Sequence, residues 1–207
     1  MEKGGVSNRA HIYGKEGSMA LMSSEELENA GIRAGAAMMA LAMRTAPKTR
    51  GIDALRTAVV SGPDLEILAS AMEKRGKDKS TDLPIFKRDA NNVRNAAAVL
   101  LVGVKREPKR MELPFNCGAC GYRSCAELVA SGPREGEDFT GPTCIFQAID
   151  LGTALGSAVK LAAEMGIDNR IMYTVGAAAK GLGLLDSDIV MGIPLSATGK
   201  NPFFDRP

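Results

Sequence analysis

Residues 96–104, AAAVLLVGV, form the most continuous apolar run in this sequence of 207 residues. A run of this length is typical of a strand that is covered on both faces. It is too short to cross a bilayer, which needs roughly 18 to 20 residues. The run therefore predicts a central strand of a buried sheet, and no membrane segment.

Periodic apolar patterns on either side of this run predict the remaining elements. We expect strands at 55–60 and 188–195. We expect helices at about 24–44, 64–75, 84–94, 125–130 and 145–165, and one more from Asn169 to the sequence GLGLL. Strands separated by helices predict an α/β or α+β sheet with long helices packed on it.

Two sequence patterns identify the first helix. Ser23 and Glu26 form a capping box at its start. Its apolar residues recur at intervals of three and four; they are Leu27, Ala30, Gly31, Ala34, Met38 and Leu41. Small side chains on this helix suit a close crossing with another helix, either within the chain or across a dimer.

Composition excludes several classes of function. The formal net charge is only +2, so no strong field recruits nucleic acid. The single histidine, His11, lies in a polar stretch and is expected at the surface, which argues against a Ser-His-Asp enzyme. We expect a cytoplasmic protein with a mobile extension at 1–22 and one domain at 23–207.

All four cysteines lie in one segment of that domain, LPFNCGACGYRSCAELVASGPREGEDFTGPTC at 113–144. They are Cys117, Cys120, Cys125 and Cys144, with the spacing C-x2-C-x4-C-x18-C. Three clustered cysteines and one remote cysteine suit the corners of a [4Fe-4S] cluster, whereas structural zinc usually takes two short C-x2-4-C pairs. Zinc, free thiols and disulfides remain the alternatives.

The residues between the cysteines favour the same interpretation. Gly118 and Gly121 allow the backbone to curl and bring N–H groups near anionic sulfur. Ser124 is placed to cap a short helix that starts at Cys125. The stretch CGACGYRSC with a distant cysteine resembles the small four-cysteine [4Fe-4S] domain of corrinoid iron-sulfur proteins and of Rnf-type electron-transfer subunits.

Outside the cysteines, the chain resembles a shortened member of the nitroreductase flavoprotein family. The matching pieces are RTAPKTRGIDALRTAVV, AAVLLVGV, LAAEMGI and AAAKGLGLLDSDIVMGIPLSATGKNPFFDR. Nearly the whole chain from Ser23 also resembles an uncharacterised family of ferredoxin-domain proteins from archaea and bacteria, DUF2148. These resemblances imply an α+β nitroreductase-like scaffold into which the iron-sulfur segment is inserted.

The nitroreductase resemblance also implies an FMN site at the interface of a homodimer. Lys48, Arg50 and Lys200, together with the SATGK turn, are the candidates for binding the flavin phosphate. The sequence departs from the family at Lys48 and Gly51, where the family carries Ser and Asn. The NPFFDR ending is a candidate for an arm that packs on the partner subunit.

Two functions follow from these observations. The first is a redox protein that passes electrons between a [4Fe-4S] cluster and a flavin, a partner protein or a small-molecule acceptor. The second is an electron carrier or accessory protein that holds the cluster without a flavin. A purely structural zinc or cluster site is the third possibility.

Overall fold

The computed structural model of the protein describes residues 21–79 and 84–204. His11 and nearly all of the predicted N-terminal extension lie outside these ranges, so the statements about them stay predictions. No helix in the described part of the chain combines the length and apolar character of a membrane span.

The centre of the fold is a four-stranded antiparallel sheet in the order β1-β2-β6-β5. Its strands are β1 (Arg56–Ser61), β2 (Ala98–Val104), β5 (Asp168–Asn169) and β6 (Ile189–Ser196). Every residue of β2 is buried, which confirms the central strand that the apolar run predicts. The register places Leu100 between Val59 of β1 and Ile193 of β6.

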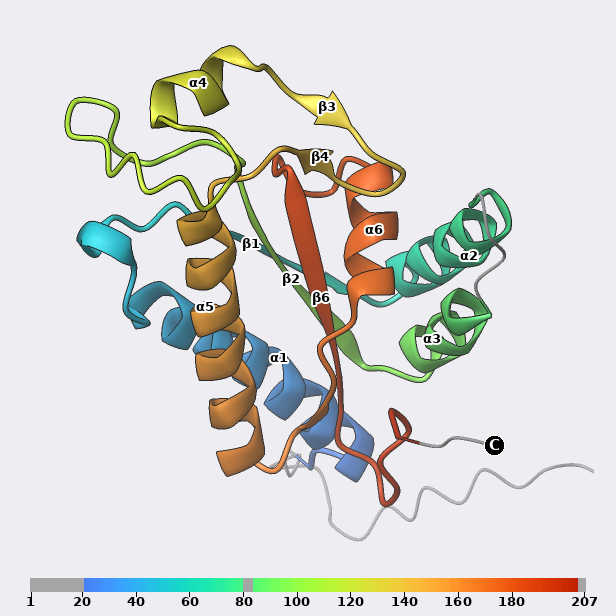
Figure 1. Ribbon diagram of the computed structural model, residues 1–207. Helices are drawn as coiled ribbons and strands as arrows, with labels where there is room; N and C mark the ends of the chain where they lie inside the picture. Colours follow the sequence, from blue (N-terminus) through green and yellow to red (C-terminus); the bar gives the residue numbers. More distant parts are fainter. Residues whose placement is uncertain (1–20, 80–83, 205–207) are drawn as a thin grey trace, which may run out of the picture.

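Helices cover both faces of this sheet (Figure 1). On one face lie α1 (Ser24–Thr45) and α5 (Ile145–Glu164). On the other lie α2 (Asp64–Lys77), α3 (Ile85–Arg94) and α6 (Tyr173–Gly181). The smaller elements are η1 (Thr49–Gly51), α4 (Cys125–Ala130) and a hairpin of β3 (Arg134–Glu135) with β4 (Thr140–Gly141).

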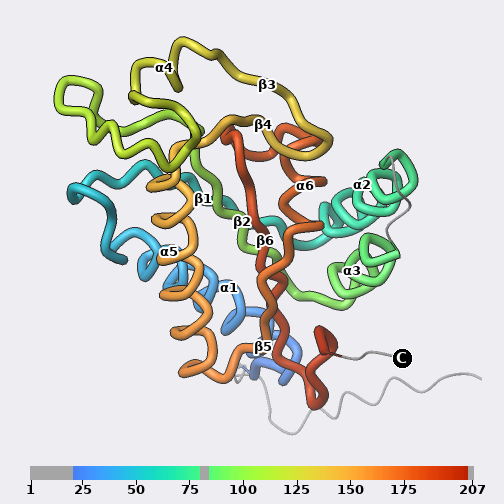
Figure 2. Tube along the Cα trace, in the orientation of Figure 1, coloured from blue at the N-terminus to red at the C-terminus, as the bar shows by residue number. Residues whose placement is uncertain are grey.

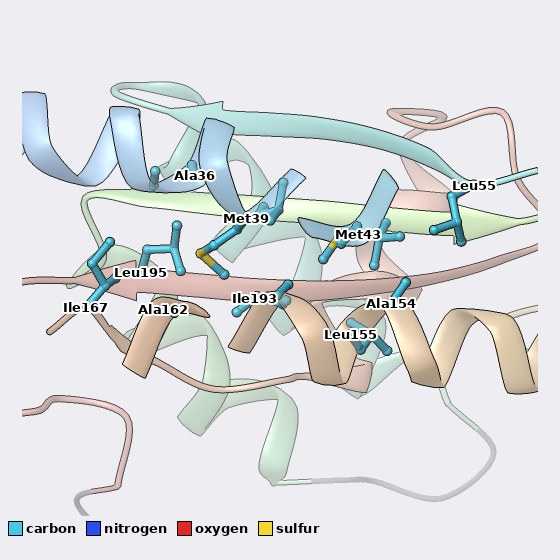
Figure 3. Close-up of a cluster of buried hydrophobic side chains, with 14 of the residues drawn as sticks. Ala36, Met39, Met43, Leu55, Ala154, Leu155, Ala162, Ile167, Ile193 and Leu195 are labelled. Atoms are coloured by element: carbon cyan, nitrogen blue, oxygen red, sulfur yellow. The ribbon is translucent and has the colours of Figure 1, made fainter. Parts of the chain in front are cut away.

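Alternating side chains of the central strands divide the core into two layers. Leu100 and Val102 point toward α1 and α5, whereas Val99 and Leu101 point toward the other three helices. Figure 3 shows the first layer, in which Met39 and Met43 of α1 meet Ile193 and Leu195 of β6 and Ala154 and Leu155 of α5. Burial of these side chains on both faces is what holds the sheet between its helices.

Two glycines allow α6 to lie directly on β6. A Cβ atom on Gly176 would come within 1.8 Å of the Val190 carbonyl oxygen, and one on Gly192 within 2.1 Å of a Val175 side-chain carbon. Neither position has room for a side chain without a shift of the backbone or of the facing residue. This contact accounts for the glycine that follows Val175 in the sequence.

The apolar set that identifies α1 is not the one that the core covers. Leu27, Met38 and Leu41 are exposed, and the buried residues of the helix are Ile32, Gly35, Ala36, Met39 and Met43. Both sets have helical spacing because the second half of α1 is apolar on all sides. Gly35 packs on Ile167, whereas Gly31 has open space beside it.

The region after α5 differs from the prediction. Gly166 follows the helix with a positive φ of 68°, which is typical of a helix C-terminus. The next helix begins at Tyr173 rather than Asn169, because Asp168 and Asn169 pair with Ser196 and Leu195 at the sheet edge. Ile171, in the segment between this pairing and the helix, is exposed.

The C-terminal segment also packs differently from the predicted arm. Phe203 is fully buried in the layer formed by α2, α3 and α6 of its own chain. Its backbone carbonyl accepts a hydrogen bond from Arg170 at 2.9 Å. Phe204 alone faces outward, with 58% of its surface exposed.

Candidate metal centre

The cysteine segment forms an excursion from one end of the sheet, between the end of β2 and the start of α5 (Figures 1 and 2). The two ends of the excursion meet, because the Cys144 N–H donates to the Arg106 carbonyl at 2.8 Å. Three cysteines lie on the excursion itself. Cys144 caps the N-terminus of α5 and so belongs to the helical scaffold.

All four cysteines line one pocket at this end of the molecule. Cys144 is buried, Cys120 and Cys125 are half-buried, and Cys117 is exposed. Side chains from the η1 loop, from the start of the excursion and from the first turn of α5 complete the pocket wall. The topology therefore brings together cysteines that lie up to 27 residues apart in the sequence.

Local backbone geometry curls the chain around the first three cysteines. Gly118 and Gly121 adopt positive φ angles of 76° and 87°, and the Gly121 N–H donates to the Gly118 carbonyl at 2.9 Å. Glycine takes this left-handed conformation without steric cost. Asn116 also has a positive φ, 46°, and its side-chain oxygen accepts the Cys125 N–H at 2.9 Å.

The predicted capping of the short helix is confirmed. Ser124 Oγ accepts the Glu127 N–H at 3.1 Å, and α4 runs over Cys125–Ala130. The cap fixes the direction in which Cys125 leaves the loop.

Cys144 lies where backbone donors converge. Burial raises the pKa of its thiol, while hydrogen bonds from the N–H groups of Phe146 and Gln147 act in the opposite direction. The nearby Cys125 and Cys117 raise this pKa further. The N-terminus of the 20-residue helix α5 opposes this increase, because the helix dipole favours negative charge there.

The donor set suits a soft metal centre. Four thiolates are the ligand set of structural zinc and of iron-sulfur clusters, and glycine-rich backbone near the sulfurs supplies further donors. Within residues 21–79 and 84–204, no three Cys, His, Asp or Glu side chains are arranged as a ready-made metal site. Binding would therefore draw the thiols together from the positions seen here.

A buried ion pair supports one wall of the pocket. Lys109 donates to Asp150 of α5 and to the Ile52 carbonyl at 2.6 Å. The other Asp150 oxygen accepts the Thr49 N–H at 2.9 Å and the Thr49 hydroxyl at 2.8 Å. One carboxylate thus joins α5, the η1 loop and the start of the excursion.

Sequence reasoning missed this ion pair, although a signal for it exists. Asp150 lies on the same helical face as the buried Leu151 and Ala154. An acidic residue on an apolar helical face requires a buried partner. Its partner, Lys109, lies in the run KREPKR, where no periodicity distinguishes one cation from another.

The β3–β4 hairpin is anchored by a second charged cluster. Asp138 accepts hydrogen bonds from Arg75 at 2.9 Å, from Lys79 and from Tyr173. Burial alone would raise the pKa of Asp138, but these donors hold it below its ordinary value. The far part of the excursion is therefore tied to α2 and α6.

The three predicted phosphate-binding cations do not come together within one chain. The Lys48 ammonium group, with 3% of its side chain exposed, donates to the carbonyls of Met43, Arg44 and Ala46 at the end of α1. Burial lowers the pKa of Lys48, with partial compensation from Asp53 and Asp150. Lys48 therefore caps α1 in this structure.

The η1 loop, which contains Arg50, lies far from the turn after β6, which contains Lys200 (Figure 1). Arg50 lines the cysteine pocket, and its guanidinium carbon lies 3.8 Å from the centre of the Phe115 ring. Its φ of 58° is unusual for a residue other than glycine. Lys200 lies in the turn after β6, where its carbonyl accepts the Thr198 hydroxyl.

Comparison with solved structures identifies the class of fold. One similar structure is an oxidoreductase containing FMN, with a TM-score of 0.51, 14% identity, and coverage of 81% of this chain and 68% of that one. A second is a putative nitroreductase in complex with FMN from Desulfovibrio desulfuricans, with a TM-score of 0.51, 14% identity, and coverage of 92% and 83%. The protein has a nitroreductase-like α+β fold, as the sequence predicts.

Sequence comparison identifies the family. Residues 140–206 match the family model of uncharacterised proteins containing a ferredoxin domain, DUF2148. An uncharacterised protein of Archaeoglobus fulgidus is 47% identical over 186 residues, which cover 90% of this chain and 97% of that protein. The chain belongs to the DUF2148 family of ferredoxin-domain proteins, and the family and fold together indicate a redox role.

Proposed function

We propose that Cys117, Cys120, Cys125 and Cys144 ligate one [4Fe-4S] cluster and that the protein transfers electrons through it. The observation that carries this proposal is the single pocket lined by all four cysteines. Three of them lie on a loop curled by glycines, and the fourth lies at the start of a long helix. This three-plus-one arrangement suits a cubane better than a two-knuckle zinc site.

The chain's own groups prepare the site for anionic sulfur. Cys144 occupies the N-cap position of α5, next to the N–H groups of the first turn, and the glycine loop keeps further backbone close to Cys117 and Cys120. A bound cluster supplies one-electron transfer, with a potential that depends on such hydrogen bonds and on solvent exposure. The exposed position of Cys117 gives an external electron donor or acceptor a short path to the centre.

A flavin at a homodimer interface is part of this proposal. The outward face of α1 carries the exposed side chains of Leu27, Met38 and Leu41, and α5 beside it exposes Ile145 and Ile149. Apolar groups gathered on two adjacent helices favour association with a second copy. Arg50 of one chain and Lys200 of the other would then approach FMN from separate subunits, since the η1 loop and the turn after β6 lie far apart within one chain.

An electron carrier without flavin is the second candidate. The observation that favours it is the engagement of Lys48 with three carbonyls of α1, which leaves this cation committed to its own helix. A scaffold of this kind would hold the cluster and pass electrons to a partner protein.

Cofactor content distinguishes the candidates. The experiment measures iron, sulfide, zinc and flavin per chain in protein purified without oxygen. About four irons and four sulfides with stoichiometric FMN support the flavin and iron-sulfur protein. Iron and sulfide without flavin support the carrier, and one zinc without iron rejects both redox functions.

Single replacements test the ligand set. Each of the four single Cys→Ala variants should lose most of its iron and sulfide, because a cubane needs four protein ligands to be bound firmly. Visible absorbance and iron content provide the readout. A variant that keeps four irons and an unchanged spectrum removes that cysteine from the set.

Flavin affinity tests the cations. Arg50→Ala and Lys200→Ala should weaken FMN binding if these side chains contact its phosphate. Lys48→Ala should act mainly on the stability of α1, because its ammonium group caps that helix. Lys160→Ala, at an exposed position on α5, serves as the control.

A further inference from the structure

A buried arginine lies directly behind the cysteine pocket. Arg106 follows β2 by two residues and is 3% exposed. Its guanidinium group donates to the Leu128 carbonyl at 3.4 Å and to the Pro142 carbonyl at 3.3 Å. Leu128 lies in α4 one turn after Cys125, and Pro142 lies two residues before Cys144.

The charge of this side chain is weakly compensated. Among the described residues, its guanidinium reaches a carboxylate within 4.0 Å only at Glu107, which is exposed and lies at that limiting distance. The Asp188 carboxylate instead accepts the Arg106 backbone N–H at 2.7 Å. Burial of a cation with so little compensation is costly unless negative charge lies nearby.

We propose that Arg106 is a positioning residue that joins the loop carrying Cys125 to the segment that leads to Cys144, and that it adds buried positive charge behind an anionic cluster held by these cysteines. This inference rests on the proposed iron-sulfur function.

The positioning part follows from the contacts on both branches. The Arg106 side chain donates to a carbonyl of α4 and to one in the segment that leads to Cys144. Its backbone carbonyl also accepts the Cys144 N–H at 2.8 Å. One residue at the end of β2 thus holds both the α4 region that follows Cys125 and the segment that leads to Cys144. Loss of these contacts leaves both cysteines free to drift apart.

The electrostatic part follows from the charge of the donor set. Four thiolates make the site strongly anionic, and each electron added to a cluster increases that negative charge. A buried cation nearby favours the reduced form, because electrostatic interactions are strong where water is excluded. Removal of this charge should therefore move the midpoint potential to more negative values.

Two variants of Arg106 separate the two parts. Arg106→Lys keeps the charge, but its ammonium nitrogen ends about one bond short of Nη1, the single nitrogen that reaches both carbonyls. Arg106→Gln keeps an N–H donor but removes the charge. Arg170→Gln is the matched control, because Arg170 also donates to a backbone carbonyl but lies at the opposite end of the sheet.

The experiment measures iron per chain and the midpoint potential of each variant purified without oxygen, with dithionite as the electron source in the titration. Arg106→Gln should show a more negative potential than both the wild type and Arg106→Lys. Both Arg106 variants should lose iron faster than the wild type to a chelator. Arg170→Gln should match the wild type in both measurements.

The alternative outcomes are distinct. If Arg106→Gln retains iron and has the potential of the wild type, the inference is wrong and the proposed function stands. If Arg106→Gln does not fold, Arg106→Lys decides, since chelator resistance equal to the wild type then refutes the positioning role. A wild-type protein without iron and sulfide contradicts the proposed function itself, and the inference with it.

Discussion

Removal of the charge on Asp150 should destabilise the protein strongly. The side chains of Asp150 and Lys109 are only 4% and 7% exposed. In Asp150→Asn the two hydrogen bonds from Thr49 can persist, but Lys109 loses its carboxylate. Breaking a buried pair in this way typically costs about 3–5 kcal/mol, because one charge stays buried without compensation.

The expected change is large enough to measure by thermal unfolding. For a domain of this size, each kcal/mol corresponds to roughly 2–4 °C in Tm, so the variant should melt about 6–20 °C below the wild type. Glu164→Gln on the same helix is the control, since its exposed pair with Lys160 contributes only about 0.3–0.5 kcal/mol. Circular dichroism of the three proteins gives the comparison.

The same variant tests whether the pocket wall depends on this pair. Iron content should fall in Asp150→Asn, because Lys109 lines the pocket and loses its anchor on α5. A cost below about 1 kcal/mol would refute the reasoning, since it would mean that Lys109 finds another partner or reaches water.

Three further predictions concern the scaffold. Phe203→Ala should cost about 3–5 kcal/mol in unfolding free energy and Phe204→Ala less than about 0.5, because only the first ring is buried; equal costs in urea unfolding would contradict the packing described. Gly176→Ala should cost about 1–3 kcal/mol or more, since its Cβ would collide with backbone, whereas Gly156→Ala on α5 has open space and should be neutral or stabilising; unfolding midpoints provide the test. The pKa of Asp138 is lowered, so its contribution to the free energy of unfolding is present above the ordinary value of 3.8 and is lost as the pH falls below it. The stability difference between the wild type and Asp138→Asn should therefore be largest near neutral pH and shrink in acid. A difference independent of pH would count against the ion cluster.

The main elements of the fold are readable from the sequence because their signals are local. The apolar run at 96–104 predicts a strand buried on both faces, and β2 is such a strand. Ser23, Ser124 and Gly166 mark helix ends through caps that involve only neighbouring residues. The positions of long helices and central strands follow from periodicity and these caps.

The choice of face on α1 could not be read in the same way. The sequence AGAAMMALAM is apolar at nearly every position, so more than one stripe has helical spacing. Only the sheet decides that Met39 and Met43 point inward while Met38 and Leu41 point outward. The predicted helix start at Asn169 is wrong for a different reason, because pairing with Leu195, a residue remote in the sequence, makes Asn169 part of an edge strand.

The candidate site shows a similar division. The cysteine spacing predicts one centre, and the structure brings all four residues to one pocket; their ligation of iron stays a prediction. Arg50 reaches that pocket, whereas Lys48 and Lys200 do not line it. Charged residues that serve the site through buried contacts, such as Lys109 and Asp150, are 41 positions apart and carry no joint signal in the sequence.

The excursion that carries the cysteines closes on itself through the 2.8 Å hydrogen bond between Arg106 and Cys144. Because its two ends meet, the scaffold can accommodate this segment as an insertion. The entropic cost of closing such a loop rises only slowly with its length. Three of the proposed ligands belong to the insert and one to the scaffold. Binding of a shared centre would therefore act as a clasp between two parts of the polypeptide, and oxidative loss of the centre would expose the insert first to proteolysis.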